Sequence, residues 1–233
     1  MIDTHCHLLP GLDDGPRRLQ ESVVLARQLV ESGVRHVICT PHFTRRYPTD
    51  HRTAARRLNE LQAVLDESGV PLKLGLAAEI GSAAAVEASR SELTQRRIGG
   101  HHLLVELERD TPAGIVEPIL VRLAQLGCTP VLAHPERCRN VRHRMRIIDA
   151  ARQQGALIQV VAPSLAGRWG EDVARAAWRL LDSGRVDILA SDSHRPRHGH
   201  DYLNAALGLV AKRLGADALQ ELTVLRPAHI VAA

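Results

Sequence analysis

The sequence predicts one α/β domain over residues 1–233, in which parallel strands alternate with helices around a closed or nearly closed (β/α)7 barrel of the TIM type. Seven short apolar runs alternate with longer amphipathic segments, and no linker or low-complexity stretch interrupts them. Residue types that bind metals follow most of the apolar runs. An open, doubly wound sheet is the alternative, and it would form a site at a switch point instead of around a ring.

Each predicted strand is a run of four to seven residues, shorter than an ordinary helix. Alternation with helices favours parallel pairing, because a parallel connection needs a crossover long enough to hold a helix. The predicted strands are Ile2–His5, His36–Thr40, Leu72–Ala78, Leu103–Leu107, Thr129–Ala133, Ala156–Val161 and Val186–Ala190.

The segments between the strands show helical periodicity. In the first of them, Leu19, Val23 and Ala26 fall on one apolar stripe, and Gly33 ends the pattern. The predicted helices are Arg18–Ser32, Thr53–Ser68, Ser82–Arg97, Gly114–Leu126, Arg144–Gln154, Asp172–Ser183 and Tyr202–Leu214.

Composition excludes several classes of protein. The net charge is only +4 and the chain has five aromatic residues, so it lacks the basic density and stacking side chains of a nucleic-acid-binding protein. The paired arginines are interpreted as solvated helix faces, with attraction of an anionic substrate as the alternative. No apolar stretch is long enough to cross a membrane, and no secretory leader is evident.

The cysteines favour a reducing compartment. The chain has four of them and no CxxC spacing, so we expect no disulfides and a cytoplasmic location. Cys39 and Cys128 lie in or beside apolar runs and are expected to be buried. Cys6 lies between two candidate ligands, but on a strand it faces away from them and should serve in packing.

The amino terminus contains the most informative motif. His5 and His7 are two residues apart, so on a strand both imidazoles point to the same face and can grip one metal ion. Asp13 and Asp14 follow on a loop rich in Gly and Pro that can fold back toward them.

Further candidate ligands lie at the ends of other predicted strands. Alone, each is explained as readily as a loop histidine or a helix cap, and Glu108 competes with Glu106 for the same place. Together they would repel one another and resist desolvation unless cations lay among them. The nine candidates are His5, His7, Asp14, His42, Glu79, Glu106, His134, Asp192 and His194.

Five imidazoles and four carboxylates exceed what one ion can bind, so two or three ions are expected. The donor set, which has no thiolate, favours Mn, Fe or Zn. Closely spaced ions suit hydrolysis of a phosphate ester by a metal-bridging hydroxide. Arg137, three residues after His134, is expected to hold a phosphoryl oxygen, with a surface ion pair to Glu136 as the alternative.

These motifs resemble the PHP (polymerase and histidinol phosphatase) superfamily of metal phosphoesterases. The finer similarity is to its bacterial protein-tyrosine phosphatases of capsule and exopolysaccharide synthesis, and the GxDDGP element is its most specific part. The similarity spans residues 1 to about 195, and a weaker match lies at residues 226–230. The motifs that carry it are at residues 1–16, 40–42, 134–137, 159–161, 164–167 and 191–194.

The resemblance implies a distorted barrel with a trinuclear site, usually described with Mn²⁺, and hydrolysis of phosphotyrosine on a partner protein, often a bacterial tyrosine kinase. Arg137 matches the family's substrate-binding arginine, and the loop from Phe43 to Asp50 would form part of the rim. The implied ligand sets are His5, His7, Glu79 and Asp192 for one ion; Glu79, Glu106 and His134 for a second; and Asp14, His42 and His194 for the third.

In the family, a second substrate-binding arginine, followed by Pro, lies several residues after the last ligand motif. This sequence departs from that pattern, since the segment reads Arg195-Pro196-Arg197. Here Arg197 is the expected second contact with phosphate, and the alternatives are Arg195 or neither arginine. Other functions with the same metals are a small-molecule phosphatase, such as a histidinol phosphatase, and a nuclease. A non-catalytic metal-binding module is a third class, and the complete ligand set disfavours it.

Overall fold

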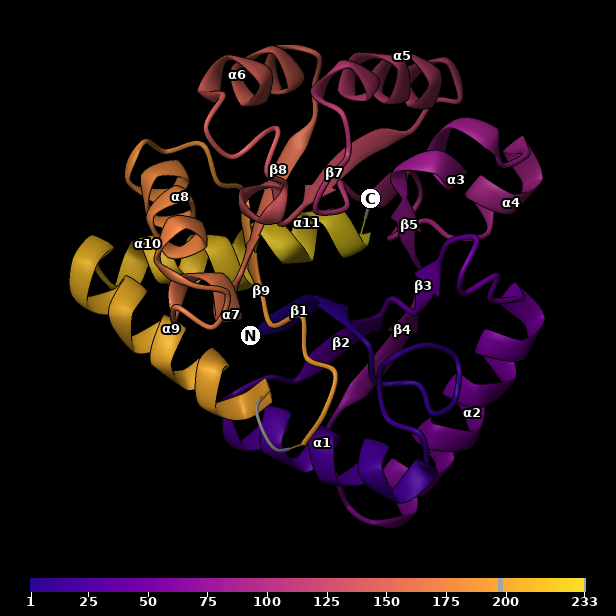
Figure 1. Cartoon of the computed structure of the whole chain (residues 1–233). Helices are drawn as coiled ribbons and strands as arrows, with labels where there is room; N and C mark the ends of the chain where they lie inside the picture. The colour runs from indigo at the N-terminus through magenta and orange to yellow at the C-terminus, as the bar shows by residue number, and fades with distance from the viewer. Residues whose placement is uncertain (197–198, 233) are drawn as a thin grey trace.

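The fold consists of parallel strands surrounded by helices (Figure 1). The structure is a computed structural model that describes residues 1–196 and 199–232. One sheet has the strand order β1-β2-β4, and the second has the order β3-β5-β6-β7-β8-β9. The described strands are β1 (Ile2–Cys6), β2 (His36–Cys39), β3 (His42–Phe43), β4 (Lys73–Leu76), β5 (Glu79–Gly81), β6 (His102–Glu106), β7 (Thr129–Ala133), β8 (Leu157–Val161) and β9 (Ile188–Ala190).

The prediction of seven strands in one ring is therefore only partly confirmed. The predicted strand Leu72–Ala78 ends early, and β4 and β5 belong to different sheets. Ala78 N–H leaves the ladder and donates to the Arg96 carbonyl at 3.3 Å. Between β2 and β3, Pro41 has no N–H to donate, so the pairing is interrupted there as well.

The two sheets also meet at the other side, where β1 lies beside the end of β9. Cys6 and Ser193 form an isolated parallel bridge, and His7 N–H donates to the Ser193 carbonyl at 2.9 Å. The buried Asp3 carboxylate accepts from Ser191 N–H at 3.0 Å and from its hydroxyl at 2.5 Å. These bonds fix the amino-terminal strand against the segment that carries Asp192.

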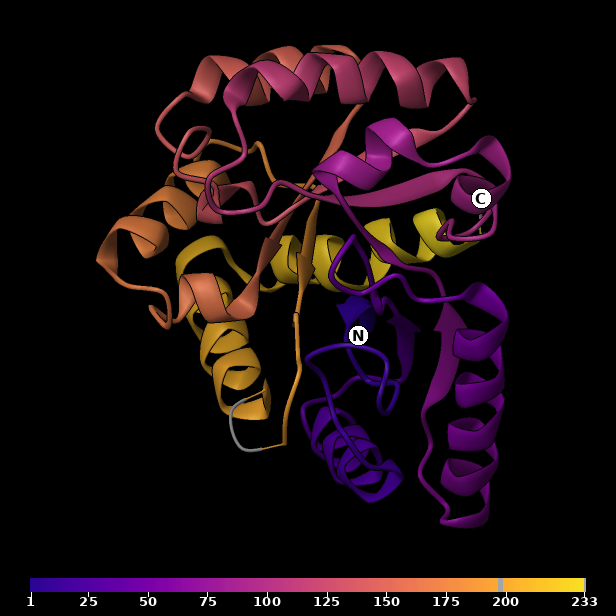
Figure 2. The ribbon, with the colours of Figure 1, turned by 45° about the vertical axis from the view of Figure 1, so that its right-hand side comes forward.

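Helices cover the outside of the strands (Figures 1 and 2). Most lie close to their predicted bounds, but the predicted helix Ser82–Arg97 is two helices. Ser89 and Glu92 form a capping box there, which starts a new helix after the extended residue Ala88. The helices are α1 (Leu19–Glu31), α2 (His51–Glu67), α3 (Ser82–Glu87), α4 (Arg90–Thr94), α5 (Val116–Gln125), α6 (Met145–Gln153), α7 (Ala162–Leu165), α8 (Glu171–Asp182), α9 (Gly199–Leu214), α10 (Ala216–Gln220) and α11 (Arg226–Ala232).

Three shorter helical segments complete the described elements. Two are 3₁₀ turns, and the third is a π-helical segment that joins α10 to α11. They are η1 (Ala113–Ile115), η2 (Pro135–Arg137) and η3 (Glu221–Leu225). In the described part of the chain, no helix combines the length and the apolar character that a membrane span requires.

The apolar core has two parts. The larger packs the strands against the surrounding helices and includes Cys6, whose predicted packing role is confirmed. The smaller joins Ile38, Leu104 and Ile188 to Ile230 of α11. Leu104 is two residues before Glu106 on β6, so both point to the same face. The smaller cluster thus lies on the face that bears the candidate ligands.

Candidate metal centre

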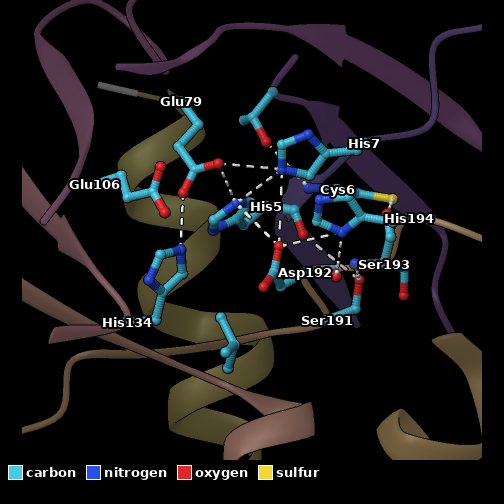
Figure 3. A network of polar contacts seen from close by, with 12 residues as sticks. His5, Cys6, His7, Glu79, Glu106, His134, Ser191, Asp192, Ser193 and His194 are labelled. Atoms are coloured by element: carbon cyan, nitrogen blue, oxygen red, sulfur yellow. Dashed lines mark hydrogen bonds and ion pairs between the residues drawn. The ribbon is translucent and has the colours of Figure 1, made fainter. Parts of the chain in front are cut away.

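The nine predicted ligands come together in one cluster, most of which is labelled in Figure 3. His5 belongs to β1, and His7 follows it. His42 begins β3, Glu79 begins β5, and Glu106 ends β6. The remaining ligands lie on loops: His134 directly after β7, Asp192 and His194 after β9, and Asp14 on the loop that follows β1.

Glu79 lies at the centre of the cluster, and its side chain is 1% exposed. Its Oε2 atom is 3.3 Å from His5 Nε2 and 3.2 Å from His7 Nε2. The same oxygen is 3.0 Å from His42 Nδ1, and Oε1 is 2.8 Å from His134 Nε2. One carboxylate therefore contacts four imidazoles, which is the arrangement of a bridging ligand.

The second carboxylate, Asp192, faces the other side of the cluster (Figure 3). Its Oδ1 atom is 3.4 Å from His5 Nε2 and 3.5 Å from His194 Nδ1. Asp14 closes the open side, with Oδ1 3.3 Å from His194 Nε2 and 3.5 Å from His42 Nε2. Asp14 is also the most exposed of these groups, with 47% of its side chain accessible.

Four overlapping groups have ligand atoms within 4.8 Å of one another, close enough to bind a common ion. They overlap the sets expected from the family but differ in three ways. His42, not His134, joins Glu79 and Glu106; His7 joins the group around Asp14; and Asp192 groups with His5 and His134 instead of with His7 and Glu79. The four groups are His7, Asp14, His42 and His194; His5, His134 and Asp192; His5, His7 and Glu79; and His42, Glu79 and Glu106.

The chemistry of the cluster fits metal ions. His42 Nδ1 and Asp192 Oδ1 are buried and face other ligand atoms at 3.0 and 3.4 Å without forming a well-aligned hydrogen bond, which is costly for groups that nothing coordinates. The imidazole and carboxylate donors suit Mn, Fe or Zn. A bound cation would satisfy these lone pairs and neutralise the carboxylates together.

The charges of the cluster are strongly coupled. Burial opposes ionisation of His5, but the charges of Glu79 and Asp192 outweigh it and raise its pKa to about 9. Burial and the Glu79 carboxylate raise the pKa of Glu106 to about 8. Burial and the Arg137 charge lower the pKa of His134 to about 4. Without metal, protons supply the positive charge that the carboxylates require, so metal binding should release protons.

Two of the predicted ligands have strained backbones. Among the described residues other than glycine, positive φ angles occur at His134 (33°) and Asp192 (50°). Such conformations cost on the order of 1–3 kcal/mol each and cluster at functional sites. Both residues directly follow the end of a strand or lie two residues beyond it, where the turn brings the side chain toward the cluster.

Two residues that orient the ligands were not predicted. Asp13 Oδ2 lies 2.7 Å from His7 Nδ1 and accepts from His42 N–H at 3.0 Å. Gln159 Oε1 lies 2.7 Å from His5 Nδ1. A sequence signal existed for Gln159, since it is the one polar residue in the apolar strand β8. Partners of this kind fix the tautomer and orientation of metal-binding histidines.

Glu106 and Glu108 have separate roles. Glu106 Oε2 lies 3.9 Å from His42 Nδ1 at the cluster. Glu108 instead caps α3, where it accepts from Ser82 N–H at 3.1 Å and from the Ser82 hydroxyl, and Thr111 Oγ1 donates to it at 2.9 Å. The geometry therefore favours Glu106 as the ligand.

Arg137 lies beside the cluster, as predicted. Its NH1 donates to Asp192 Oδ2 at 3.0 Å, and burial of its side chain is incomplete, with 29% exposed. It lines two cavities, each of about 430 Å³, on either side of the ligands. Arg195 lines the first of these cavities. Arg197, the expected second contact with phosphate, lies outside the described residues.

The chain belongs to the CpsB/CapC family of capsular polysaccharide synthesis, whose model matches residues 1–232. It is 31% identical over 225 residues to tyrosine-protein phosphatase YwqE of Bacillus subtilis. This similarity covers 93% of this chain and 86% of YwqE. It is 26% identical over 238 residues to tyrosine-protein phosphatase CpsB of Streptococcus pneumoniae, and the similarity covers 99% of this chain and 98% of CpsB.

The solved structures agree with this membership. The fold matches a structure from a study of YwqE and CpsB as metal-dependent tyrosine phosphatases, with a TM-score of 0.86, 26% identity and coverage of 99% of this chain and 94% of that one. A D-hydantoinase shares the fold more distantly, with a TM-score of 0.61, 11% identity and coverage of 97% and 69%. The curated relatives above do not favour the alternative of a histidinol phosphatase.

Proposed function

We propose that this protein is a metal-dependent phosphatase that hydrolyses phosphotyrosine on protein substrates. The observation that carries the proposal is the convergence of nine ligand side chains beside one partly exposed arginine, in a chain of the CpsB/CapC family. Both relatives described above are tyrosine-protein phosphatases. The reaction class is hydrolysis of a phosphoric monoester.

The metal centre is proposed to hold two or three Mn²⁺ ions, with Fe or Zn as alternatives. The nine predicted residues would be the ligands, and Glu79 would bridge, since it contacts four of the five imidazoles. When bound, such ions supply the Lewis-acid chemistry that activates water and neutralises phosphoryl oxygens. Asp13 and Gln159 would hold the rings of His7 and His5 in the orientation that this binding requires.

Arg137 is the proposed substrate-binding residue. Its guanidinium reaches from Asp192 into the cavities on both sides of the cluster, so it can donate two parallel hydrogen bonds to a phosphoryl oxygen pair placed there. The leaving group of phosphotyrosine is a phenolate, whose acid has a pKa of about 10, so the site does not need a strong general acid. Arg197 stays a proposed second contact, with Arg195 as the alternative.

The biological setting is proposed more broadly. The substrate would be a bacterial tyrosine kinase linked to polysaccharide synthesis, in line with the family description. A cytoplasmic location is supported by four buried cysteines that form no disulfide. We treat residues 1–233 as one catalytic domain and the two sheets as one distorted barrel of seven strand positions. The hydrogen bonds between β1 and the end of β9 support that description.

The proposal is tested by comparing initial rates of hydrolysis of a phosphotyrosyl peptide and of histidinol phosphate, with Mn²⁺ supplied and with a chelator as the control. We expect a strong preference for the peptide and loss of that activity on chelation. A preference for histidinol phosphate would keep the metal centre but overturn the proposed substrate.

A further inference from the structure

The cavity that contains Arg195 has an aromatic wall. Its inner side is formed by Asp14, Asp192 and His194 of the ligand cluster. Its outer side includes Arg168 and Trp169, from the turn between α7 and α8. Trp169 is 43% exposed, which is unusual for so large a ring in a chain with only five aromatic residues. An exposed ring beside a phosphate-binding site calls for an explanation.

The turn that bears Trp169 is well defined. Gly170 N–H donates to the Gly167 carbonyl at 3.1 Å, and both glycines have positive φ angles, 93° and 80°. Arg168 N–H donates to the Pro163 carbonyl at 3.0 Å, which attaches the turn to α7. The ring itself contacts two guanidinium groups, with Arg137 4.7 Å and Arg168 4.9 Å from its centroid. These cation–π contacts fix the indole in place before substrate arrives.

Arg137 connects the ring to the ligand cluster. Its NH1 lies 3.0 Å from Asp192 Oδ2, while its guanidinium carbon lies 4.7 Å from the centroid of the Trp169 ring. A phosphoryl group bound at the metal centre and by Arg137 would therefore have its ester substituent next to the indole. For phosphotyrosine that substituent is a phenyl ring, which can pack edge-to-face or offset against the exposed part of Trp169.

We propose, on the basis of the proposed function, that Trp169 is the platform for the phenyl ring of phosphotyrosine and determines the preference for aryl over alkyl phosphate esters. An aliphatic phosphate ester would leave this ring unpaired. Arg168, which also lies 5.1 Å from the Tyr202 ring, is a positioning residue for the platform.

The cavity on the other side of Arg137 also contains an aromatic residue, Tyr47. Its ring already packs nearly parallel on His42, with 11° between the planes and 5.6 Å between the centroids. That face is covered by a candidate ligand, and Glu106 and Glu108 add carboxylates to the same cavity. The Trp169 side is therefore the better site for an aryl ester.

The first test measures binding directly. The chain has two tryptophans, so the W178F variant leaves Trp169 as the only indole fluorophore. Trp178 lies on α8 and takes no part in the cavity at the ligand cluster. In Mn²⁺-loaded W178F, phenylphosphonate should change the Trp169 emission saturably, and methylphosphonate at the same occupancy should change it much less. Equal responses to the two phosphonates would contradict the proposal.

The second test measures inhibition constants for the same two phosphonates against phosphotyrosyl peptide hydrolysis. W169A should raise the constant for phenylphosphonate about tenfold and leave that for methylphosphonate within twofold, because the contact with the phenyl ring is lost while Asp192 still holds Arg137 at 3.0 Å. W169F should restore most of the affinity. If Y47A weakens phenylphosphonate and W169A does not, the ring enters the other cavity and the inference is wrong, although the proposed function stands. If the wild-type protein does not hydrolyse the peptide, the proposed function fails and the inference with it.

Discussion

At the scale of single residues, the site depends on side chains that hold the ligands as much as on the ligands. Asp13 is shared between His7 Nδ1 and His42 N–H, so one carboxylate orients one ligand ring and fixes the backbone of another. Burial opposes ionisation of Asp13, but the His7 charge and these hydrogen bonds lower its pKa. It is therefore a stable anionic acceptor next to the metal centre.

We predict that D13A weakens Mn²⁺ binding about 10- to 100-fold, the usual effect of removing a partner that orients a metal-binding histidine. Activity should return largely at saturating Mn²⁺, because the ligands themselves remain. Calorimetric titration with Mn²⁺ measures the change. D110A is the control, since Asp110 is 70% exposed and pairs with Arg139 at 3.3 Å. Unchanged Mn²⁺ affinity in D13A would show that Asp13 does not support the centre.

For the substrate, we predict that R137A lowers kcat/KM for a phosphotyrosyl peptide on the order of 100-fold, the size of effect seen when one donor to a developing anion is lost. R137K should recover only part of the loss, because an ammonium group lacks the planar fork of the guanidinium. R139A is the matched control, since Arg139 is half exposed and two residues away. A loss of less than threefold in R137A would rule out the proposed contact with phosphate.

Single residues were predictable where strand periodicity placed them. All nine candidate ligands lie in the cluster, although His42 and Glu79 begin their strands instead of ending them. Asp13 could not be distinguished from its neighbour Asp14 in this way, since both are on an irregular loop. Trp169 was not predicted either, because its position depends on a turn formed by Gly167 and Gly170.

At the scale of elements, the short helix α3 shows how a carboxylate near the site can serve the fold instead. Glu108 accepts from the N–H and hydroxyl of Ser82 at the start of this helix. Glu106, two residues earlier, points into the ligand cluster. The alternation of strand side chains does not separate these two roles, because both residues have the same parity.

We predict opposite phenotypes for the two glutamates. E108A should lower the free energy of unfolding by about 1–3 kcal/mol, because buried donors at the start of α3 lose their acceptor, and should leave Mn²⁺ affinity nearly unchanged. E106A should weaken Mn²⁺ binding about tenfold or more without a comparable loss of stability in the metal-free protein. Urea unfolding and Mn²⁺ titration of both variants give the comparison, and the reverse pattern would exchange the two assignments.

Most helices were predictable from apolar periodicity, and the exceptions have local causes. The predicted helix Ser82–Arg97 breaks because the capping box of Ser89 and Glu92 satisfies the first N–H groups of a new helix. The two helices after α9, α10 and α11, were not predicted. Of these, α11 contributes Ile230 to the smaller apolar cluster, a contact that only the tertiary fold reveals.

At the scale of the whole molecule, the strand that ends at the site begins with a buried histidine. His102 starts β6 and is 7% exposed, and burial together with the nearby His101 lowers its pKa to about 4. The folded protein therefore keeps this imidazole neutral. The unfolded chain takes up the proton near the ordinary pKa of 6.5.

This shift predicts a pH dependence of stability. Above about pH 6.5 His102 is neutral in both states and its contribution is fully present; as pH falls from 6.5 toward 4, the unfolded state binds the extra proton and stability is lost. In the H102N variant, the free energy of unfolding should therefore depend less steeply on pH in this window, by up to one proton. Urea titrations at several pH values measure the slope. Equal slopes for the variant and the wild type would contradict the assignment.

The parallel α/β organisation of the molecule was predictable, but its division into two sheets was not. Pro41 interrupts one strand path, and the bond from Ala78 N–H to Arg96 diverts another. Neither event changes the apolar pattern from which strands are predicted. The strands that resume after these two breaks are β3 and β5. They begin with His42 and Glu79, so each break places a candidate ligand at the start of a strand.

The central claim is that the converged side chains bind the metal ions on which phosphotyrosine hydrolysis depends. The most direct measurement follows bound Mn²⁺ and phosphotyrosyl peptide hydrolysis in the same samples of wild type, H7A and D192A. We expect two or three ions in the wild type, with turnover that rises as they bind, and loss of both ions and turnover in the variants. Full turnover in the chelated wild type, or near-normal turnover in both variants, would contradict the account.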